Sequence, residues 1–439
     1  MEGNGYTVGL YTLGCKVSQY ETEAVAEAFE RAGFAVCPFD AVCDVYVINT
    51  CTVTAESDRK SRQIIRRAVQ RNPRARVMVC GCYAQTSGEA VARIPGVAYV
   101  SGSAHKTELP ARALSLLSAP KGGAVCAVSD IACEPFEAME ITRAPRTRAY
   151  VKIEDGCECR CTYCAIPAAR GPVRSKAPAD VVREVMGLAR GGTREVVLTG
   201  IETASYGTDL GDVRLIDLLE MLDAQPGVPR LRLGSLTPEL IRPDFVARYA
   251  ALRHATPHLH LSVQSGADPV LRAMRRRYNR AMALSAIFAL REAIPAMQFT
   301  TDLMVGFPGE REEDFADTLD FVRQARFLAV HTFAYSARPG TPAAAFPDQV
   351  PPAVRHRRSA ELIALSGAVG AAELDAVAAA ARPLSVLFET AEDGRYIGHS
   401  AEYIEVAVPD AGKDLHGRIV RVQPDAREGE RLCGHILSD

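Results

Sequence analysis

Strand-like and helix-like segments alternate along most of this sequence, and this alternation limits the possible folds more than any other feature. Between residues 6 and 118, the β-rich runs TVGLYTL, VYVINT and RVMVCGC each precede an amphipathic stretch. Gly33 and the Asn72-Pro73 pair stand where the first two helices should end. Parallel neighbouring strands need a crossover, which is usually a helix. We therefore predict an N-terminal parallel α/β sheet domain over residues 1–118.

The alternation resumes at about residue 148 with six further β-rich runs: AYVKIEDG, REVVLTG, RLRLGSL, HLHLSVQSG, FTTDLMVGFP and HTFAYS. Residues 119–147, which include Lys-Gly-Gly and Arg-Ala-Pro-Arg, are predicted to form a linker. A closed eightfold barrel usually takes about 250 residues, more than these units occupy. We predict a partial (β/α)6 barrel and a connecting helix over residues 148–375.

Residues 376–439 have a different pattern. After the end of an Ala-rich helix, short strands such as LSVLFET and GRIVRVQ alternate with Gly-bearing turns. This pattern predicts a small C-terminal β-barrel, a shape that often holds nucleic acid. Lys413, Arg418 and the aromatic Tyr403 in this tail suit RNA.

Composition favours a multi-domain protein of the cytoplasm. The 439 residues exceed the usual size of one core. Since no apolar run reaches the roughly 18 to 20 residues of a membrane span, we expect a soluble protein with no membrane partner. The N-terminus shows no export signal. In such a chain, thirteen cysteines are more typical of metal ligands, catalytic thiols or buried residues than of disulfides.

Local basic blocks stand out against a net charge of -2. From Arg59 to Arg76 there are eight Lys or Arg and no acid, and Arg275-Arg276-Arg277 is also basic. Such blocks either form solvated helix faces or contact a polyanion.

The segment GCECRCTYCAIP places Cys157, Cys161 and Cys164 in a C-x3-C-x2-C pattern, with Cys159 as an extra thiol. Three thiolates can fill three corners of a 4Fe-4S cluster and leave one iron open for chemistry. Alternatively, the four cysteines hold one structural zinc. The motif follows the first predicted barrel strand, at the end where barrel enzymes place their active sites.

Cys15, Cys51 and Cys82 each follow a predicted strand of the N-terminal sheet. The carboxyl ends of parallel strands share one edge, so these thiols are expected to converge and hold a second cluster with an open position. The alternative is three unrelated buried cysteines. Cys37, Cys43 and Cys80 are interpreted as core residues.

The motif at Cys157, Cys161 and Cys164, its neighbours Tyr163 and Ile166-Pro167, and the six βα units resemble the radical S-adenosylmethionine (SAM) superfamily. The resemblance implies that the open iron binds S-adenosyl-L-methionine and that reduction releases a 5′-deoxyadenosyl radical. Candidate cofactor contacts lie beside the motif, before the second predicted barrel strand and at the ends of strands, although the glycines also suit ordinary turns. The candidates are Tyr163, Gly191, Gly192, Gly200, Ser235, Gln264 and Gly306.

The three-domain order is similar to that of the methylthiotransferases, and the tail resembles their RNA-binding TRAM domain. LGCKVSQYE and NTCTVTAESDRKSRQ resemble the branch that acts on N6-threonylcarbamoyladenosine at position 37 of tRNA, beside the anticodon. The resemblance implies two 4Fe-4S clusters and conversion of C2–H to C2–SCH3. It also implies three partners: the tRNA anticodon stem-loop, an electron donor such as flavodoxin or ferredoxin, and a sulfur donor.

Cys159, Ser18 and Glu202 depart from the family pattern, and Glu202 is either a site residue or a solvated loop acid. Rival functions are a methylthiotransferase acting on isopentenyladenosine of tRNA or on a ribosomal-protein side chain, and a non-catalytic zinc-dependent RNA-binding protein.

Overall fold

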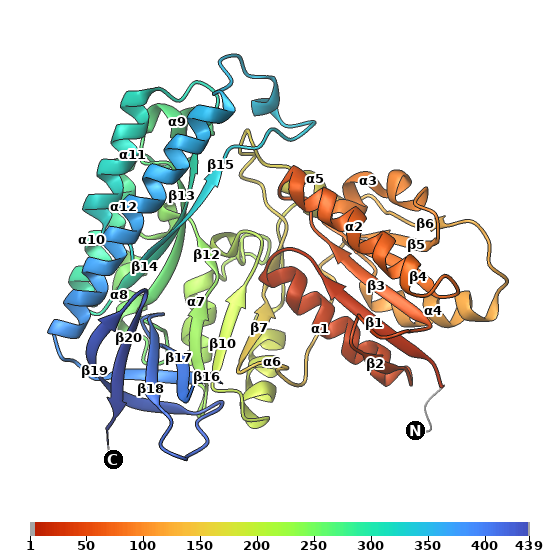
Figure 1. Ribbon diagram of the computed structural model, residues 1–439, viewed down its shortest axis with the longest axis horizontal. Coiled ribbons are helices and arrows are strands. Elements are labelled where there is room, and N and C mark those ends of the chain that lie inside the picture. Colours follow the sequence, from red (N-terminus) through yellow and green to blue (C-terminus); the bar gives the residue numbers. More distant parts are fainter. Residues whose placement is uncertain (1–4, 438–439) are drawn as a thin grey trace.

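The computed structural model describes residues 5–437, so residues 1–4 and 438–439 of the predicted terminal domains lie outside the described part. Figure 1 shows an α/β domain at the N-terminal end, a curved sheet lined by helices, and a small β-barrel at the C-terminal end. The predicted fold class is confirmed.

The N-terminal domain is a parallel sheet with strand order β2-β1-β3-β4-β5-β6. Helix α1 lies between this sheet and the barrel, and its Tyr20 hydroxyl donates to Glu184 of the barrel at 3.0 Å. The elements are β1 (Thr7–Thr12), α1 (Lys16–Arg31), β2 (Ala35–Cys37), β3 (Val45–Thr50), α2 (Ala55–Arg71), β4 (Arg76–Gly81), α3 (Cys82–Ala92), β5 (Val97–Gly102), α4 (Leu109–Ser118) and β6 (Val125–Cys126).

The segment 119–147 packs against both neighbours. Its Val125–Cys126 strand pairs with β5, and Met139 and Ile141 are buried in the core. The Thr142 amide donates to the Glu27 carboxylate on α1 at 2.9 Å. These contacts attach the barrel to α1.

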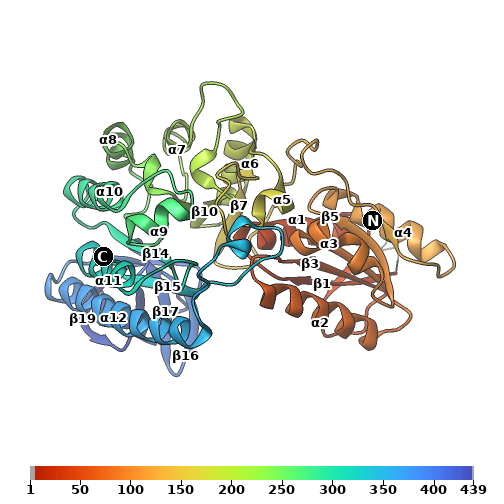
Figure 2. The same cartoon turned by 90° about the horizontal axis from the view of Figure 1, so that it is seen from above.

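The central sheet keeps its strands in sequence order, which is the order of a partial barrel. It divides at Gly234 into β7-β10-β11 and β12-β13-β14-β15, and every neighbouring pair is parallel. Figure 2 shows the helices on the outer side of this curve. The elements are β7 (Arg148–Lys152), β8 (Glu154–Asp155), α5 (Ile166–Arg170), β9 (Arg174–Ser175), α6 (Pro178–Arg190), β10 (Glu195–Thr199), α7 (Leu215–Asp223), β11 (Arg230–Leu233), β12 (Ser235–Leu236), α8 (Pro243–Ala251), β13 (His258–Gln264), α9 (Asp268–Ala273), α10 (Arg280–Ala293), β14 (Gln298–Val305), α11 (Glu312–Ala325) and β15 (Ala329–Ala334).

The tail is a closed barrel with strand order β16-β17-β18-β20-β19, as predicted. Its strands are β16 (Leu384–Glu392), β17 (Arg395–Ser400), β18 (Glu405–Pro409), β19 (Ile419–Glu428) and β20 (Arg431–Ile436). It docks on the amino ends of the central strands, where Arg148 of β7 donates to Glu389 at 2.8 Å. Tyr403 stacks on His258 at this junction, so it serves docking rather than the RNA contact expected from sequence.

Helix α12 (Pro352–Ala379) connects the two barrels. Among helices in residues 5–437, it alone has the length and apolar composition of a membrane span. It packs against α11, β15 and β19, and it buries the charged side chains of Arg358 and Glu373. These contacts are made by one face of the helix, and most of its other residues are exposed or half-buried.

Candidate active site

The loop with Cys157, Cys161 and Cys164 lies between β8 and α5, beyond the carboxyl end of β7. Gly156 begins it with φ of 91°, and a Cβ there would meet the Pro172 carbonyl oxygen at 1.8 Å. Only glycine therefore fits this position. The Cys157 amide donates to the Gly171 carbonyl at 3.0 Å, which fixes the loop to the chain that follows.

A cavity of about 340 Å³ opens beside this loop. Residues of both the N-terminal domain and the barrel line it, and those from the N-terminal domain are Val53 and Thr54. Its other lining residues are Cys157, Cys159, Cys161, Tyr163, Cys164, Ala165, Ile166, Ile201, Glu202, Ser262, Gln264, Arg276, Asp302, Met304, Phe333, Ala334, Tyr335, Ser336 and Arg338. The four thiols of the motif thus face one space.

The thiols are already engaged by polar groups. Cys161 Sγ accepts from Arg276 Nη1 at 3.3 Å, and Cys164 Sγ accepts from the Ile166 amide at 3.4 Å. Burial raises the pKa of the Cys164 thiol to about 11. Because metal binding requires thiolates, a bound cation would have to displace these protons.

Cys159 and Glu202 belong to the same cavity. One ligand atom each of Cys157, Cys159 and Glu202 lie within 4.8 Å of one another. Burial, followed by the Cys159 charge, raises the pKa of Glu202 to about 8. Its Oε1 accepts from Thr237 at 3.4 Å, so Glu202 is a site residue by position and not a solvated loop acid.

The N-terminal cysteines gather at the carboxyl edge of their sheet. Cys15 caps α1, Cys51 follows β3, and Cys82 begins α3 after β4. A Cβ on Gly14, the neighbour of Cys15, would lie 3.2 Å from Cys51 Sγ. The pKa of the Cys82 thiol is raised to about 11, chiefly by burial and also by nearby Cys15 and Cys51, while Arg170 opposes the rise. The predicted convergence of Cys15, Cys51 and Cys82 is thus present in the structure.

Arg170 connects the two sets of cysteines. It ends α5, the helix that follows Cys164, and its Nε donates to Cys82 Sγ at 3.0 Å. Its Nη1 also donates to Glu21 Oε1 at 2.6 Å and to Asp155 Oδ2 at 3.2 Å. The guanidinium is fully buried.

A buried ionic cluster surrounds this arginine. The cations are Lys106, Lys152, Arg170 and Arg174, and the anions are Glu21 and Asp155. Burial alone would raise the pKa of the Glu21 carboxyl, but Arg170, Lys106 and Lys152 lower it well below its usual value. The cations of these ion pairs outnumber the anions, and the excess positive charge complements thiolates at Cys15, Cys51 and Cys82.

Four of the predicted cofactor contacts lie at or beside the cavity. Tyr163 and Gln264 line it, and Ser235 Oγ is 2.8 Å from Oγ of the lining residue Ser262. Gly200 follows β10, where a Cβ would meet the Glu154 carboxylate at 2.4 Å.

The remaining predicted glycines differ in their surroundings. Gly306 follows β14 with φ of 71°, and a Cβ would meet the Arg355 side chain at 2.2 Å. Gly191 and Gly192 lie between α6 and β10, at the amino end of that strand and away from the cysteines. Since Gly192 has φ of 95°, we interpret this pair as turn residues.

Sequence reasoning missed the arginines of this region. Arg276 was assigned to a solvated or polyanion-binding block, yet it lines the cavity and donates to Cys161. Arg338 of the segment after β15 donates to Thr52 and Asp58, each at 2.7 Å, and so holds the loop that carries Cys51. Arg338 follows the last predicted barrel strand, HTFAYS, and nothing in its local sequence pointed to this contact.

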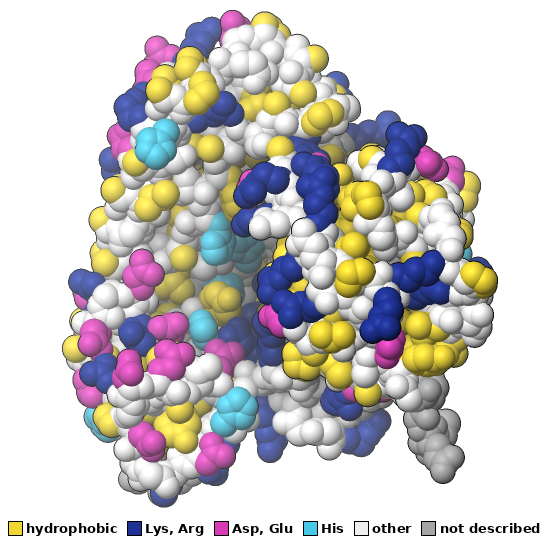
Figure 3. All heavy atoms as spheres, turned by 45° about the vertical axis from the view of Figure 1, so that its right-hand side comes forward, with side chains coloured by type: hydrophobic (Ala, Val, Ile, Leu, Met, Phe, Trp, Pro, Cys, Tyr) yellow, Lys and Arg dark blue, Asp and Glu magenta, His cyan; other side chains and the backbone are white. Residues whose placement is uncertain are grey.

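The predicted basic face is present on α2. Ser61, Ile65 and Ala68 are buried, while Arg59, Lys60, Arg66, Arg67 and Arg71 are exposed. Figure 3 shows Lys and Arg side chains on the N-terminal lobe beside the hollow that separates it from the barrel.

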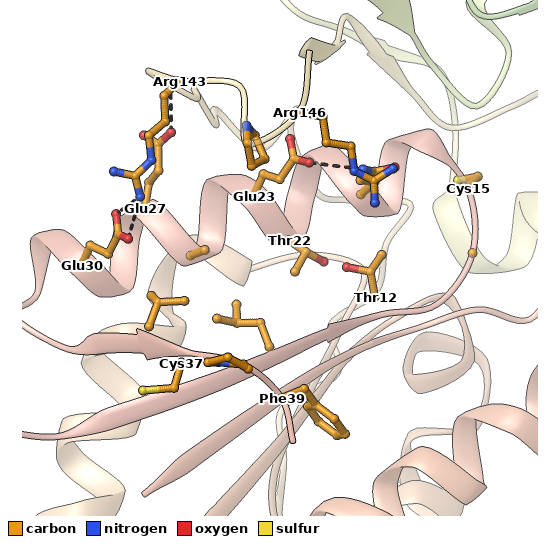
Figure 4. A pocket seen from close by; sticks show the side chains of 17 residues that line it. Thr12, Cys15, Thr22, Glu23, Glu27, Glu30, Cys37, Phe39, Arg143 and Arg146 are labelled. Carbon is orange, nitrogen blue, oxygen red and sulfur yellow. Dashed lines mark hydrogen bonds and ion pairs between the residues drawn. The ribbon is translucent and has the colours of Figure 1, made fainter. Parts of the chain in front are cut away.

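A groove of about 580 Å³ runs along α1 and reaches Cys15. Figure 4 shows Glu23, Glu27 and Glu30 along its helical side. The Arg143 guanidinium pairs with Glu30, and its backbone amide donates to Glu27. Burial raises the pKa of Glu23 to about 7.

Two family descriptions match the chain. "Radical SAM superfamily" matches residues 151–322, and "Uncharacterized protein family UPF0004" matches residues 7–102. A threonylcarbamoyladenosine tRNA methylthiotransferase MtaB of Bacillus subtilis is 38% identical over 95% of this chain and 93% of its own length. A tRNA-2-methylthio-N(6)-dimethylallyladenosine synthase of Acidothermus cellulolyticus is 38% identical over 82% of this chain and 73% of its own length.

Solved structures share the fold. The radical S-adenosylmethionine methyltransferase TsrM of Kitasatospora setae, with cobalamin and a [4Fe-4S] cluster bound, superposes with a TM-score of 0.60 at 17% identity. The alignment covers 78% of this chain and 77% of that one.

Proposed function

Because the chain belongs to the MtaB-type methylthiotransferase family, we propose that it converts N6-threonylcarbamoyladenosine at position 37 of tRNA to its 2-methylthio derivative. One observation carries this proposal: two sets of three cysteines lie on either side of the junction between the N-terminal domain and the barrel, and Arg170 joins them. The transfer needs both a radical source and a sulfur source close to one carbon atom.

Cys157, Cys161 and Cys164 would hold one 4Fe-4S cluster, and Cys15, Cys51 and Cys82 would hold a second. The donor sets fit, since each offers three thiols and leaves one iron free for a ligand. When bound, the first cluster and one S-adenosylmethionine would supply the radical that removes the C2 hydrogen, the second cluster would present the sulfur, and a second S-adenosylmethionine would supply the methyl group. Tyr163, Gln264 and Ser235 would orient the cofactor.

We further propose that the anticodon stem-loop lies across the hollow of Figure 3. The exposed arginines of α2 would bind phosphates, and the C-terminal barrel, a TRAM-like domain, would add further basic contacts. Phosphate binding of this kind weakens as the salt concentration rises and depends little on the RNA sequence. The pocket must therefore provide the selectivity for the substrate. A soluble cytoplasmic enzyme of this kind also needs an electron donor such as flavodoxin or ferredoxin.

The sulfur donor would approach through the groove along α1. Cys15 is the exposed member of its set, and the groove reaches it from solvent. Cys51 and Cys82 are buried and cannot be approached in this way.

A second candidate substrate is dimethylallyladenosine of tRNA. Relatives with that name are 36% to 38% identical to this chain, as similar as those named for threonylcarbamoyladenosine. The anaerobically reconstituted protein should be given anticodon stem-loops with either modification, and the nucleosides analysed by mass spectrometry. We expect the 2-methylthio product from the threonylcarbamoyl loop. Product only from the dimethylallyl loop, or active protein that holds zinc and no iron, would refute the proposal.

A further inference from the structure

Two large apolar side chains are exposed in the cysteine cavity, one from each side of the junction between the domains. Within residues 5–437, eleven large hydrophobic side chains are exposed, and Val53 and Phe333 are the two that line this cavity. Val53 belongs to the N-terminal domain and is 55% exposed, and Phe333 belongs to β15 and is 47% exposed. Exposed apolar surface that gathers in a concave site indicates a ligand that covers it.

The sheet presents the ring of Phe333 to the cavity. Phe333 pairs in register with Met304 of β14, and Met304 lines the same cavity. The two side chains therefore lie on the inner face of the sheet. Within the described range 5–437, the Phe333 ring stacks on no other aromatic side chain and has no cation over it. The ring is thus free to stack on a ligand.

The residues on either side of Val53 hold it in place. Thr52 Oγ1 accepts from Arg338 at 2.7 Å, and Thr54 Oγ1 caps α2 by accepting from the Ser57 amide at 3.1 Å. Val53 therefore lies in an anchored turn, although its own side chain is left exposed. This turn follows Cys51, which belongs to the N-terminal set of cysteines.

An aromatic ring and an aliphatic side chain in one cavity suit a planar ligand. Enzymes that react with a base take it out of its stack and hold it between aromatic and apolar side chains. Single-stranded RNA loops are recognised in the same way, because their bases can turn outward and stack on aromatic rings. The cavity volume of about 340 Å³ is within the range of roughly 300–1,000 Å³ for small-molecule sites.

We propose that Phe333 is the platform on which the adenine at position 37 stacks, and that Val53 packs against this base from the N-terminal domain. The inference rests on the proposed function, since it takes a nucleoside of the anticodon loop as the substrate. Phe333 shares its cavity with the cysteines of the barrel motif, whereas Val53 follows Cys51 by two residues. A base that contacts both side chains lies between the two sets of cysteines.

This site recognises the adenine ring and not the group on its N6 atom. Stacking on an aromatic side chain tolerates different bases, because every base has a π face. Threonylcarbamoyladenosine and isopentenyladenosine share the ring, so both should bind to Phe333. Discrimination between them must therefore come from other residues.

The test measures equilibrium binding of the reconstituted protein to three anticodon stem-loops, which carry threonylcarbamoyladenosine, isopentenyladenosine or an abasic site at position 37. The quantity compared is the affinity for each modified loop divided by the affinity for the abasic loop. Base stacking on an aromatic side chain contributes enough that Phe333→Leu should lower this ratio about fivefold or more. Phe333→Tyr keeps the ring and should keep the ratio.

Two further variants complete the series. Val53→Thr replaces a methyl group by a hydroxyl at nearly constant volume and should lower the ratio in the same direction. The control is Phe288→Leu, because Phe288 is 48% exposed but lies on α10, on the outer side of the barrel (Figure 2). Phe288→Leu should leave the ratio unchanged, and all four variants should keep the iron content of the wild-type protein.

The outcomes separate the platform from the proposed function. If Phe333→Leu keeps the full ratio, the platform is wrong although the function stands. If Phe333→Leu lowers the ratio but the wild-type protein forms a 2-methylthio product only from the isopentenyl loop, the platform stands and the proposed function fails. Wild-type protein that binds the abasic loop as tightly as the two modified loops would overturn the platform.

Discussion

Arg170 Nε donates a hydrogen bond to Cys82 Sγ at 3.0 Å. Arg170 ends the helix that begins beside Cys164, whereas Cys82 belongs to the N-terminal sheet. A single buried side chain thus fixes the distance between the two sets of cysteines. Its positive charge lies beside the set in the N-terminal domain.

Replacing Arg170 by Met should destabilise the protein and loosen the N-terminal cluster. Glu21 and Asp155 would keep their buried charges but lose their main partner, which typically costs about 3–5 kcal/mol. Iron per chain should fall from about eight toward about four after anaerobic reconstitution. Unchanged iron content would contradict a role for Arg170 at Cys82.

The matched control for that change is Arg143→Met. Arg143 pairs with Glu30 at the surface, where an ion pair contributes about 1 kcal/mol or less. Loss of this ion pair should leave the iron content unchanged. A fall in iron content that occurs in both variants would therefore come from preparation of the protein and not from Arg170.

Replacing each set of three cysteines by Ala should remove a different half of the iron. About four iron atoms per chain should remain when Cys157, Cys161 and Cys164 are changed, and about four when Cys15, Cys51 and Cys82 are changed. Cys159→Ala and the buried control Cys43→Ala should each keep about eight. Loss of iron from Cys159→Ala alone would show that the motif uses a different trio.

Arg338→Met should loosen the loop that carries Cys51. Arg338 donates to Thr52 and Asp58, and a hydrogen bond to a charged group contributes about 1.5–3 kcal/mol. Amide hydrogen exchange over residues 51–58 should become faster, while exchange in the C-terminal barrel stays the same. Equal rates in wild-type protein and variant would rule out this attachment.

Glu310 should make stability depend on pH. Burial raises the pKa of its carboxyl to about 7, although Gly306 and Arg358 oppose this. The folded protein therefore holds the proton more tightly than the unfolded chain. The stabilisation is complete below the usual value of 4.5 and is lost as pH rises toward about 7.

Thermal unfolding of reconstituted protein at about pH 5 and about pH 7.5 tests this dependence. Glu310→Gln should reduce the difference between the two midpoints, and any constant cost of the substitution cancels in that difference. Glu312→Gln is the control, because Arg357 lowers the pKa of the exposed Glu312 and moves its titration below this range. An unaltered difference in Glu310→Gln would refute the assignment.

The alternation of strands and helices and the two sets of cysteines were predictable because local sequence determines them. The βα repeats gave the parallel sheets, and Cys15, Cys51 and Cys82 each follow a strand whose end is readable. Gln264 was predictable for the same reason, because it ends a strand and lines the cavity at that strand's carboxyl end. Gly191 and Gly192 were candidates because glycine lets the backbone approach a cofactor closely, but they precede their strand and form the turn that was the alternative.

The ionic cluster around Arg170 and the grouping of His260, Asp302 and His331 were not predictable, because they depend on partners far apart in the chain. Arg170 and Glu21 are 149 residues apart, and Arg276 looked like one of three solvated arginines. His260, Asp302 and His331 stand on three strands whose register is fixed only in the folded sheet.

The most direct test of the central claim is the nucleoside profile of tRNA from cells that lack this protein. We predict that the 2-methylthio derivative of N6-threonylcarbamoyladenosine disappears while its unmodified precursor accumulates. Wild-type protein should restore it, and Cys157→Ala protein should not. An unchanged profile of threonylcarbamoyladenosine derivatives in the deletion strain would contradict the account.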